Sequence, residues 1–240
     1  MPAQLKPAAF LDRDGVINSY VYNPEFGTVD SPSHPDQFEL KPGAAKAIAM
    51  LNRLGLPVIV VSNQPGVAKR KFSVELLQSM TEKMHAEIEA GGGKLDAVYY
   101  CLHHPQAAVA EYRRQCYCRK PQPGLLFEAA RDFGIDLGRS YMIGDAITDI
   151  AAGNRAATRT ILVSGRKCYL CEELERRQLR PDFVVESLVR AAELVRALEQ
   201  GDCVDNGLAC APEELAGDGP LAAGFYSCLP YVKSELAEML

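Results

Sequence analysis

The sequence predicts an α/β fold in which a parallel β-sheet is covered by helices on both faces. Apolar runs of strand length alternate along the chain with longer segments whose apolar residues recur every three or four positions. The run at residues 57–61 (PVIVV) is apolar throughout, which is typical of a strand buried on both faces. Because parallel strands need long crossover connections, this alternation favours a parallel sheet with helices on each side.

The expected elements can be placed in chain order. Strands are expected at residues 8–11, 57–61, 97–102, 141–143, 160–163 and 183–185. Helices are expected at residues 44–54, 74–90, 124–133 and 188–198. Ser73 is suited to cap the second helix and Pro123 to begin the third, while Gly55, Gly91 and Gly134 follow the ends of the first three.

Two segments interrupt the alternation. Residues 19–41 contain three prolines and are expected to form an extended loop, long enough to serve as a functional flap. Residues 101–121 are a second long, polar connection. Only about 20 residues between the first two strands are expected to be loop, so no separate cap domain fits there. We therefore expect one domain over residues 1–200, followed by an acidic extension at residues 201–240 of unknown role.

The composition is that of an ordinary globular protein, with 48% apolar and 24% charged residues among 240. The net charge of −5 is concentrated in residues 201–240, which hold seven acidic residues and one basic residue. An anionic substrate must therefore be held by local Arg and Lys side chains, and no nucleic-acid surface is indicated. No apolar stretch approaches the ~20 residues of a membrane span, and no secretory signal is evident, so we expect a cytoplasmic protein. The oligomeric state is left open, with a monomer slightly favoured.

Polar residues follow three of the expected strands. Asp12 and Asp14 come after the first, Ser62 after the second, and Asp145 after the fourth. Parallel sheets bind ligands beyond the carboxyl ends of their strands, so these side chains are expected to converge at one edge. Lys120, in an Arg-Lys-Pro sequence, adds an ammonium group. Paired carboxylates, a hydroxyl and an ammonium predict a magnesium-dependent site for phosphoryl transfer.

Each of these groups has an expected role. Asp12 would attack phosphorus and form an aspartyl-phosphate. Asp14 lies on the same side of an extended chain, two residues on, and would protonate the leaving oxygen and then activate water. Ser62 would hold the phosphoryl oxygens and Lys120 would neutralise them. Asp12, Asp14 and Asp145 would bind Mg²⁺.

Neighbouring residues are expected to support the same chemistry. Asn63, Gln64 and Arg119 adjoin the hydroxyl and the ammonium and are expected to bind the substrate. Asp149 is expected to orient the ammonium or the waters on the metal. A phospho-receiver module would use similar groups around a parallel sheet, but it would lack a second acid at the position of Asp14. A catalytically inactive scaffold is opposed by the presence of every chemical group.

Five segments resemble the haloacid dehalogenase superfamily of phosphatases. They are FLDRDGVIN at residues 10–18, VSNQPGVA at 61–68, CLHHP at 101–105, CYCRKPQPGLL at 116–126 and MIGDAITDIAAG at 142–153. They are most similar to the branch of heptose bisphosphate and histidinol-phosphate phosphatases. The resemblance implies the roles given above, a Rossmann-like fold without a large cap domain, and a small phosphate ester as substrate. Without the second domain of bifunctional histidine enzymes, the 7-phosphate of a heptose 1,7-bisphosphate is favoured over histidinol phosphate.

The eight cysteines favour thiols or metal ligands over disulfides in a reducing compartment. Cys101, His103, Cys116 and Cys118 supply the ligand set of a closed structural Zn²⁺ site, although loose thiols beside a surface histidine also fit the spacing. The family resemblance implies zinc at these four positions. Zinc would order the loop at residues 101–121 and so place the Arg-Lys pair over the substrate.

Three differences from the family bear on the substrate. Residues 69–71 (Lys-Arg-Lys) are more basic than the family's usual Arg-Gly-Lys, and Ala146 stands where heptose-type relatives often carry Lys. The loop at residues 19–41 is also longer than in the shortest relatives. Cys168 and Cys171 form an isolated CxxC pair, for which a structural role is the simplest interpretation.

Overall fold

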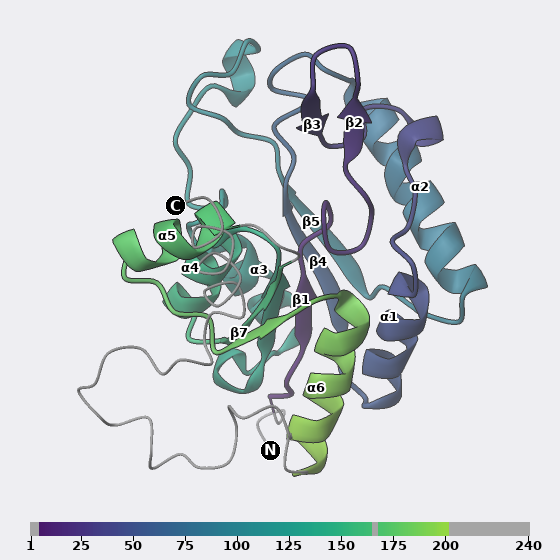
Figure 1. Cartoon of the computed structure of the whole chain (residues 1–240), viewed down its shortest axis with the longest axis vertical. Coiled ribbons are helices and arrows are strands. Elements are labelled where there is room, and N and C mark those ends of the chain that lie inside the picture. The colour runs from purple at the N-terminus through teal and green to yellow at the C-terminus, as the bar shows by residue number, and fades with distance from the viewer. Residues whose placement is uncertain (1–4, 165–167, 202–240) are drawn as a thin grey trace, which may run out of the picture.

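The computed structural model describes residues 5–164 and 168–201, which fold around a six-stranded sheet (Figure 1). All neighbouring strands are parallel, in the order β5-β4-β1-β6-β7-β8. The strands are β1 (Ala9–Leu11), β4 (Val58–Asn63), β5 (Ala97–Cys101), β6 (Tyr141–Gly144), β7 (Arg159–Val163) and β8 (Phe183–Val185). The prediction of a parallel, Rossmann-like α/β sheet is confirmed.

Helices cover both faces of this sheet. They are α1 (Ala44–Arg53), α2 (Val74–Ala90), α3 (Gly124–Phe133), α4 (Ile147–Arg155), α5 (Cys168–Arg176) and α6 (Leu188–Gln200), with short 3₁₀ turns η1 (Pro35–Gln37), η2 (Ala110–Tyr112) and η3 (Leu137–Arg139). One core packs α1, α2 and α6 against Leu11 and Val60. The other packs α3 and α4 against Phe10 and Ile59. Successive strand residues point to opposite faces, so each central strand supplies both cores, which explains its apolar sequence.

The expected strands and helices are all present, with ends that differ by one or two residues, and α4 and α5 are additional. Helix α4 buries Ile150 with the small residues Ala151, Ala152 and Gly153. A Cβ on Gly153 would lie 2.9 Å from the Cβ of Met142, so the helix lies close against the sheet. This stripe of small residues lacks the periodic large side chains by which an amphipathic helix is found in a sequence.

Residues 19–41 are not wholly an extended loop, which corrects the sequence expectation. They contain an antiparallel hairpin of β2 (Val21–Asn23) and β3 (Thr28–Asp30), followed by η1. In its turn, Asn23 Oδ1 accepts a 3.0 Å hydrogen bond from the backbone N–H two residues on, and Gly27 adopts a φ of +62°. The three prolines lie in the turn or after β3, so they do not interrupt strand pairing.

The hairpin and the loop that contains η2 rise on the same side of the sheet (Figure 1). The hairpin follows the carboxyl end of β1, and the loop follows that of β5. The segment after β4 contacts both of them. Its Ala68 carbonyl accepts hydrogen bonds from the N–H groups of Ala108 and Val109, at 2.9 and 3.0 Å. Its Lys71 forms an ion pair with Asp30 of the hairpin. These contacts connect the three segments on the carboxyl side of the sheet, where the site was expected.

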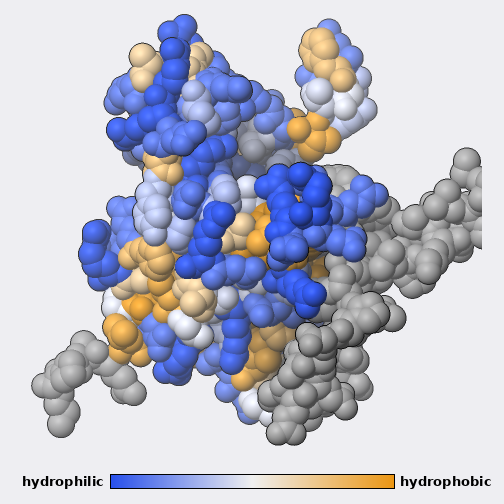
Figure 2. Space-filling model, turned by 90° about the vertical axis from the view of Figure 1, so that its left-hand side faces the viewer, coloured by the Kyte–Doolittle hydropathy of each residue, from blue (hydrophilic) through white to orange (hydrophobic). Residues whose placement is uncertain are grey.

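The face drawn in Figure 2 is mostly hydrophilic, with hydrophobic residues in separate patches. Within the described ranges, none of the helices combines the length and the apolar character that crossing a membrane requires. Residues 202–240 of the expected acidic extension lie outside the described residues. Cys168 and Cys171 belong to helix α5, but their side chains also lie outside the description.

Candidate active site and zinc site

Two neighbouring strands bring together carboxylates that lie far apart in the sequence. Asp12 directly follows β1, and Asp145 directly follows β6. The Asp12 N–H donates a 2.9 Å hydrogen bond to the carbonyl of Ile143, which continues the pairing of the two strands into the site. The expected convergence at the carboxyl edge is therefore present for these two groups.

Lys120 is the centre of the charge arrangement. Its side chain is only 1% exposed, and its Nζ lies 2.9 Å from Asp12 Oδ1 and 2.6 Å from Asp149 Oδ1. Nζ also donates a 2.8 Å hydrogen bond to the carbonyl of Val61. Burial by itself would lower the pKa of Lys120, but Asp12 and Asp149 together raise it above its ordinary value. The ammonium is therefore a fixed positive charge beside Asp12.

Asp149 connects this ammonium to helix α4. Its Oδ2 accepts a 2.9 Å hydrogen bond from the N–H of Ala146, the residue before the helix, and so caps the N-terminus. Burial raises the pKa of Asp149 to about 7, against the opposing effect of Lys120. A Cβ on Gly144 would lie 2.2 Å from the Cβ of Asp149, so only glycine fits beneath it. The carboxyl is thus fully enclosed, with Lys120 on one oxygen and the helix on the other.

Asn63 lies against the backbone of Lys120. Its Nδ2 donates to the Lys120 carbonyl, and its Oδ1 accepts from the Lys120 N–H, both at 3.0 Å. These two bonds position Lys120. The expected role of Asn63 in substrate binding stays a prediction.

Asp14 is buried among hydrogen-bond donors. Arg13 donates to its Oδ1 from Nη2 at 2.9 Å and from Nε at 3.1 Å, and Asn18 donates to the same oxygen at 3.0 Å. Gln64 donates to Oδ2 at 2.8 Å and to the Ser62 hydroxyl at 3.2 Å. Gln64 therefore bridges two expected catalytic groups, and its expected contact with the substrate stays a prediction.

Two residues of the site escaped the sequence interpretation. Arg13 is fully buried, with its guanidinium 5.7 Å from the ring centre of Tyr100. The sequence position of Arg13, between two acids at the end of an apolar run, could have indicated its role, because a buried charge requires a partner of opposite charge. Tyr20 lies with its hydroxyl 3.1 Å from Asp145 Oδ2. No sequence pattern marked Tyr20, because the contact depends on how the hairpin folds.

Three carboxylates lie close enough together to share a cation. Oxygens of Asp12, Asp145 and Asp149 lie within 4.8 Å of one another, and hard oxygen ligands of this kind suit Mg²⁺. Asp149 is already held by Lys120 and by helix α4, which leaves Asp12 and Asp145 as the better ligands. The carboxylate of Asp14 lies outside this group, so its expected role as a magnesium ligand stays a prediction.

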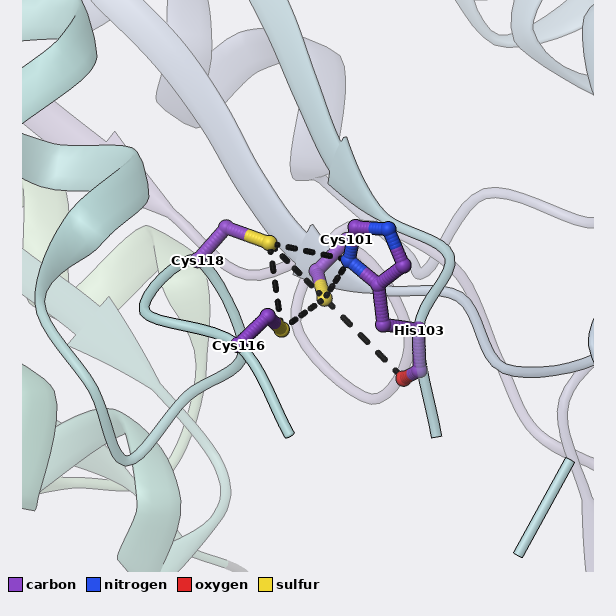
Figure 3. A group of neighbouring side chains, drawn as sticks. All are labelled: Cys101, His103, Cys116 and Cys118. Atoms are coloured by element: carbon purple, nitrogen blue, oxygen red, sulfur yellow. Dashed lines mark hydrogen bonds between the residues drawn. The ribbon is translucent and has the colours of Figure 1, made fainter. Parts of the chain in front are cut away.

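The four expected zinc ligands meet at one point (Figure 3). The sulfur of Cys118 lies 3.3 Å from the sulfurs of both Cys101 and Cys116, which are themselves 3.5 Å apart. His103 Nδ1 lies 3.3 Å from the Cys118 sulfur and 3.8 Å from that of Cys101. Ligands around tetrahedral zinc are separated by roughly 3.5–3.8 Å, so this cluster fits the ion closely. The three cysteines form no disulfide.

The zinc cluster adjoins the catalytic cluster along the chain. Arg119 and Lys120 directly follow Cys118, and Arg119 Nη1 donates a 3.1 Å hydrogen bond to the carbonyl of His103. His104 is not a member of the metal-binding group among the described residues. Burial lowers the pKa of His104, as do the positive charges of Lys69 and Arg119.

Comparison with known proteins relates this geometry to one family. A family model described as "HAD-hyrolase-like" matches residues 117–191. The D-glycero-beta-D-manno-heptose-1,7-bisphosphate 7-phosphatase of Escherichia coli (strain K12) is 36% identical over 203 residues, covering 82% of this chain and 96% of the relative. The protein of the same name from Yersinia pestis is 36% identical over 198 residues, covering 81% and 97%. The chain belongs to the haloacid dehalogenase-like phosphatases.

Solved structures agree with this assignment. The D,D-heptose 1,7-bisphosphate phosphatase of B. bronchiseptica, complexed with magnesium and phosphate, is 30% identical with a TM-score of 0.66, covering 80% of this chain and 99% of that one. The enzyme of the same name from Burkholderia thailandensis is 28% identical with a TM-score of 0.56, again covering 80% and 99%. This haloacid dehalogenase-like phosphatase is therefore a hydrolase of phosphate monoesters, as the sequence predicted.

Proposed function

We propose that this phosphatase releases the 7-phosphate of D-glycero-D-manno-heptose 1,7-bisphosphate in a Mg²⁺-dependent reaction. The relatives that carry this activity in their names align with about four-fifths of the chain. The observation that supports the chemistry most directly is the position of Lys120 between Asp12 and Asp149, with Asp145 beside them. Such a site combines a carboxylate nucleophile with fixed positive charge at the place where a phosphoryl group would bind.

In the first half of the reaction, Asp12 is the nucleophile. Its known contacts, with the Arg13 N–H at 2.8 Å and with Lys120 at 2.9 Å, are both made through Oδ1, so attack on phosphorus would use the other oxygen. A bond forms from Asp12 to phosphorus, and the bond from phosphorus to the sugar oxygen breaks. Asp14 gives its proton to that departing oxygen. Lys120 stabilises the negative charge of the phosphoryl oxygens.

In the second half, water attacks phosphorus and the aspartyl-phosphate is hydrolysed. Asp14 takes the proton from this water, the bond from phosphorus to Asp12 breaks, and phosphate leaves. Among the described residues, the side-chain hydrogen bonds to Asp14 come from donor groups on Arg13, Asn18 and Gln64, an arrangement suited to a proton acceptor. The proton that Asp14 takes from water is the one it gives to the leaving oxygen of the next substrate, and for that step Asp14 must turn away from Gln64 toward the substrate.

Mg²⁺ would be held by Asp12 and Asp145 in this reaction. When bound, it supplies positive charge that reduces repulsion between the carboxylate nucleophile and the phosphate. The carboxylate group found in the structure fits this ion, and the relative from B. bronchiseptica was solved with magnesium and phosphate. Ser62 is expected to hold a phosphoryl oxygen, and Asp14 is the further magnesium ligand proposed from the sequence.

Zinc at Cys101, His103, Cys116 and Cys118 would have a structural role. Four protein ligands complete a tetrahedral shell and leave no position for substrate. By fixing the chain up to Cys118, the ion would hold Arg119 at the mouth of the site. Free thiols at this cluster are consistent with the proposed cytoplasmic location. We also propose that the phosphatase domain spans residues 1–200.

The test is phosphate release with Mg²⁺ from both anomers of heptose 1,7-bisphosphate, from histidinol phosphate and from a panel of sugar phosphates. Turnover of the heptose bisphosphate far above the others, abolished by Asp12→Asn, is expected. Preference for histidinol phosphate would reject the sugar substrate while keeping the reaction. A long-lived phosphorylated Asp12 without turnover would instead indicate a phospho-receiver.

A further inference from the structure

We propose that Tyr20 is a positioning residue that holds Asp145 in place for Mg²⁺ and thereby ties the β2–β3 hairpin to the metal site. The inference rests on the proposed function in one respect, the assignment of Mg²⁺ to Asp145. Asp145 follows β6 at this edge, and one contact with its carboxylate comes from the root of the hairpin.

The hydroxyl of Tyr20 lies within hydrogen-bond distance of both oxygens of the Asp145 carboxylate. It lies 3.1 Å from Oδ2 and 3.3 Å from Oδ1. A phenol hydroxyl has one proton, so it can donate fully to only one of these oxygens at a time. This neutral donor limits the rotation of the carboxylate without adding a positive charge beside it.

Gly15 makes this contact possible. A Cβ at position 15 would lie 2.3 Å from Asp145 Oδ2 and 2.7 Å from Tyr20 Cε2, and Gly15 has a φ of +84°. Both the backbone conformation and the space therefore require glycine. The Gly15 carbonyl accepts a 2.6 Å hydrogen bond from Lys41 Nζ, which holds this turn against the other end of the flap segment. Tyr20 and Asp145 are packed together over a rigid turn.

The Tyr20 hydroxyl lies beside a group of carboxylates. It contacts Asp145, and oxygens of Asp145 and Asp12 lie within 4.8 Å of each other. These same carboxylates repel one another. The Tyr20 hydroxyl favours one orientation of the Asp145 carboxylate that mutual repulsion would not select by itself. Hydrogen-bond donors that do not touch the metal orient metal ligands in this way.

The position of Tyr20 in the chain couples the metal site to the hairpin. Tyr20 immediately precedes β2, and the N–H of Ser19 donates a 2.9 Å hydrogen bond to the Glu39 carbonyl, so the root of the hairpin is anchored on both sides. Farther out, Tyr22 is 61% exposed and Phe26 is 70% exposed. The root is therefore fixed by the site while the tip faces solvent.

The experiment compares Tyr20→Phe, which removes only the hydroxyl, with Tyr22→Phe as a matched control on the same hairpin. Mg²⁺ binding is measured by calorimetry on the resting enzyme, and the Mg²⁺ concentration for half-maximal activity is measured separately from kcat and from the substrate KM. Tyr20→Phe is expected to weaken Mg²⁺ binding about tenfold, with substrate KM at saturating Mg²⁺ unchanged. Tyr22→Phe is expected to match the wild type.

Wild-type Mg²⁺ affinity in Tyr20→Phe would overturn the inference and reduce Tyr20 to a packing residue. A raised substrate KM with unchanged Mg²⁺ binding would also overturn it. Adding Tyr20→Phe to Asp145→Asn should have no further effect on metal binding if the hydroxyl acts through Asp145. The calorimetry needs no turnover, so it remains a valid test even if the proposed substrate is wrong. If the proposed role of Tyr20 is wrong, the Asp12-dependent turnover that tests the proposed function is unaffected.

Discussion

The side-chain amide of Asn63 forms two 3.0 Å hydrogen bonds with the backbone of Lys120, one to its carbonyl and one from its N–H. Asn63 ends strand β4, whereas Lys120 comes from the loop after the zinc cluster. This pair of bonds is therefore the junction between the sheet and the loop that carries the ammonium. It explains how a residue outside any helix or strand is held within 2.9 Å of the Asp12 carboxylate.

Asn63→Ala should lower both stability and kcat. Loss of two hydrogen bonds is expected to cost about 1–3 kcal/mol of unfolding free energy, and a displaced ammonium should reduce kcat at least tenfold. Urea unfolding and steady-state kinetics measure the two effects. Asn52→Ala is a matched control, because Asn52 forms the same pair of bonds with the Lys94 backbone, at 3.0 and 2.8 Å, away from the site. It should lose stability but keep kcat, and equal kcat losses would contradict the proposed role of Asn63.

Lys120→Met should abolish turnover and destabilise the fold. It leaves Asp149 buried without its ion-pair partner, and removing one member of such a pair typically costs about 3–5 kcal/mol. Denaturant unfolding in buffer without added Mg²⁺ measures this cost without that ion to replace the lost charge. Adding Asp149→Asn should recover part of the stability but none of the turnover. If Lys120→Met by itself were as stable as the wild type, the buried carboxyl of Asp149 would not need Lys120 for its stability.

Zinc uptake should release protons and weaken as pH falls. Burial raises the pKa of the Cys101 thiol, and so does the neighbouring Cys118; burial likewise raises the pKa of Cys118. Thiols that are protonated near neutral pH must lose their protons to bind zinc. Calorimetry in buffers of different protonation enthalpy measures the release, and metal analysis should find one zinc per chain. His104→Ala should retain this zinc, whereas Cys116→Ser should lose it; zinc retained by Cys116→Ser would reject the ligand set.

Arg13→Lys should reduce kcat by about tenfold or more although the charge is conserved. Arg13 contacts Asp14 through two nitrogens, a fork that a lysine ammonium cannot reproduce. The misplaced Asp14 would then transfer protons less effectively, so the pH profile of kcat should change as well. Arg159→Lys is a control, because Arg159 lies 5.8 Å from the ring centre of Tyr141, as Arg13 lies over Tyr100, but away from the site; it should leave kcat unchanged. An unchanged pH profile in Arg13→Lys would indicate that Arg13 has only a packing role.

The central elements could be predicted because their signals are local. Strand β4 is apolar throughout and needs no partner to be recognised, and helix α2 begins after Ser73, whose hydroxyl caps it as expected. The positions of Asp12 and Asp145 at strand ends likewise follow from the sequence alone. For the zinc ligands, the spacing by itself left loose thiols open, and the family resemblance implied zinc; the structure then brings all four ligands together.

The sequence by itself thus determined the fold class, the family and the chemical groups of the site. Only the tertiary structure decided which way those groups face. Asn63 and Gln64 lie beside Ser62 in the chain, yet one contacts Lys120 and the other Asp14. Tyr20 reaches Asp145 across 125 positions of sequence. The hydrogen-bond partners of a polar side chain at a strand end depend on which strands and loops lie next to it, and that adjacency is created by burial of the apolar core far from the site.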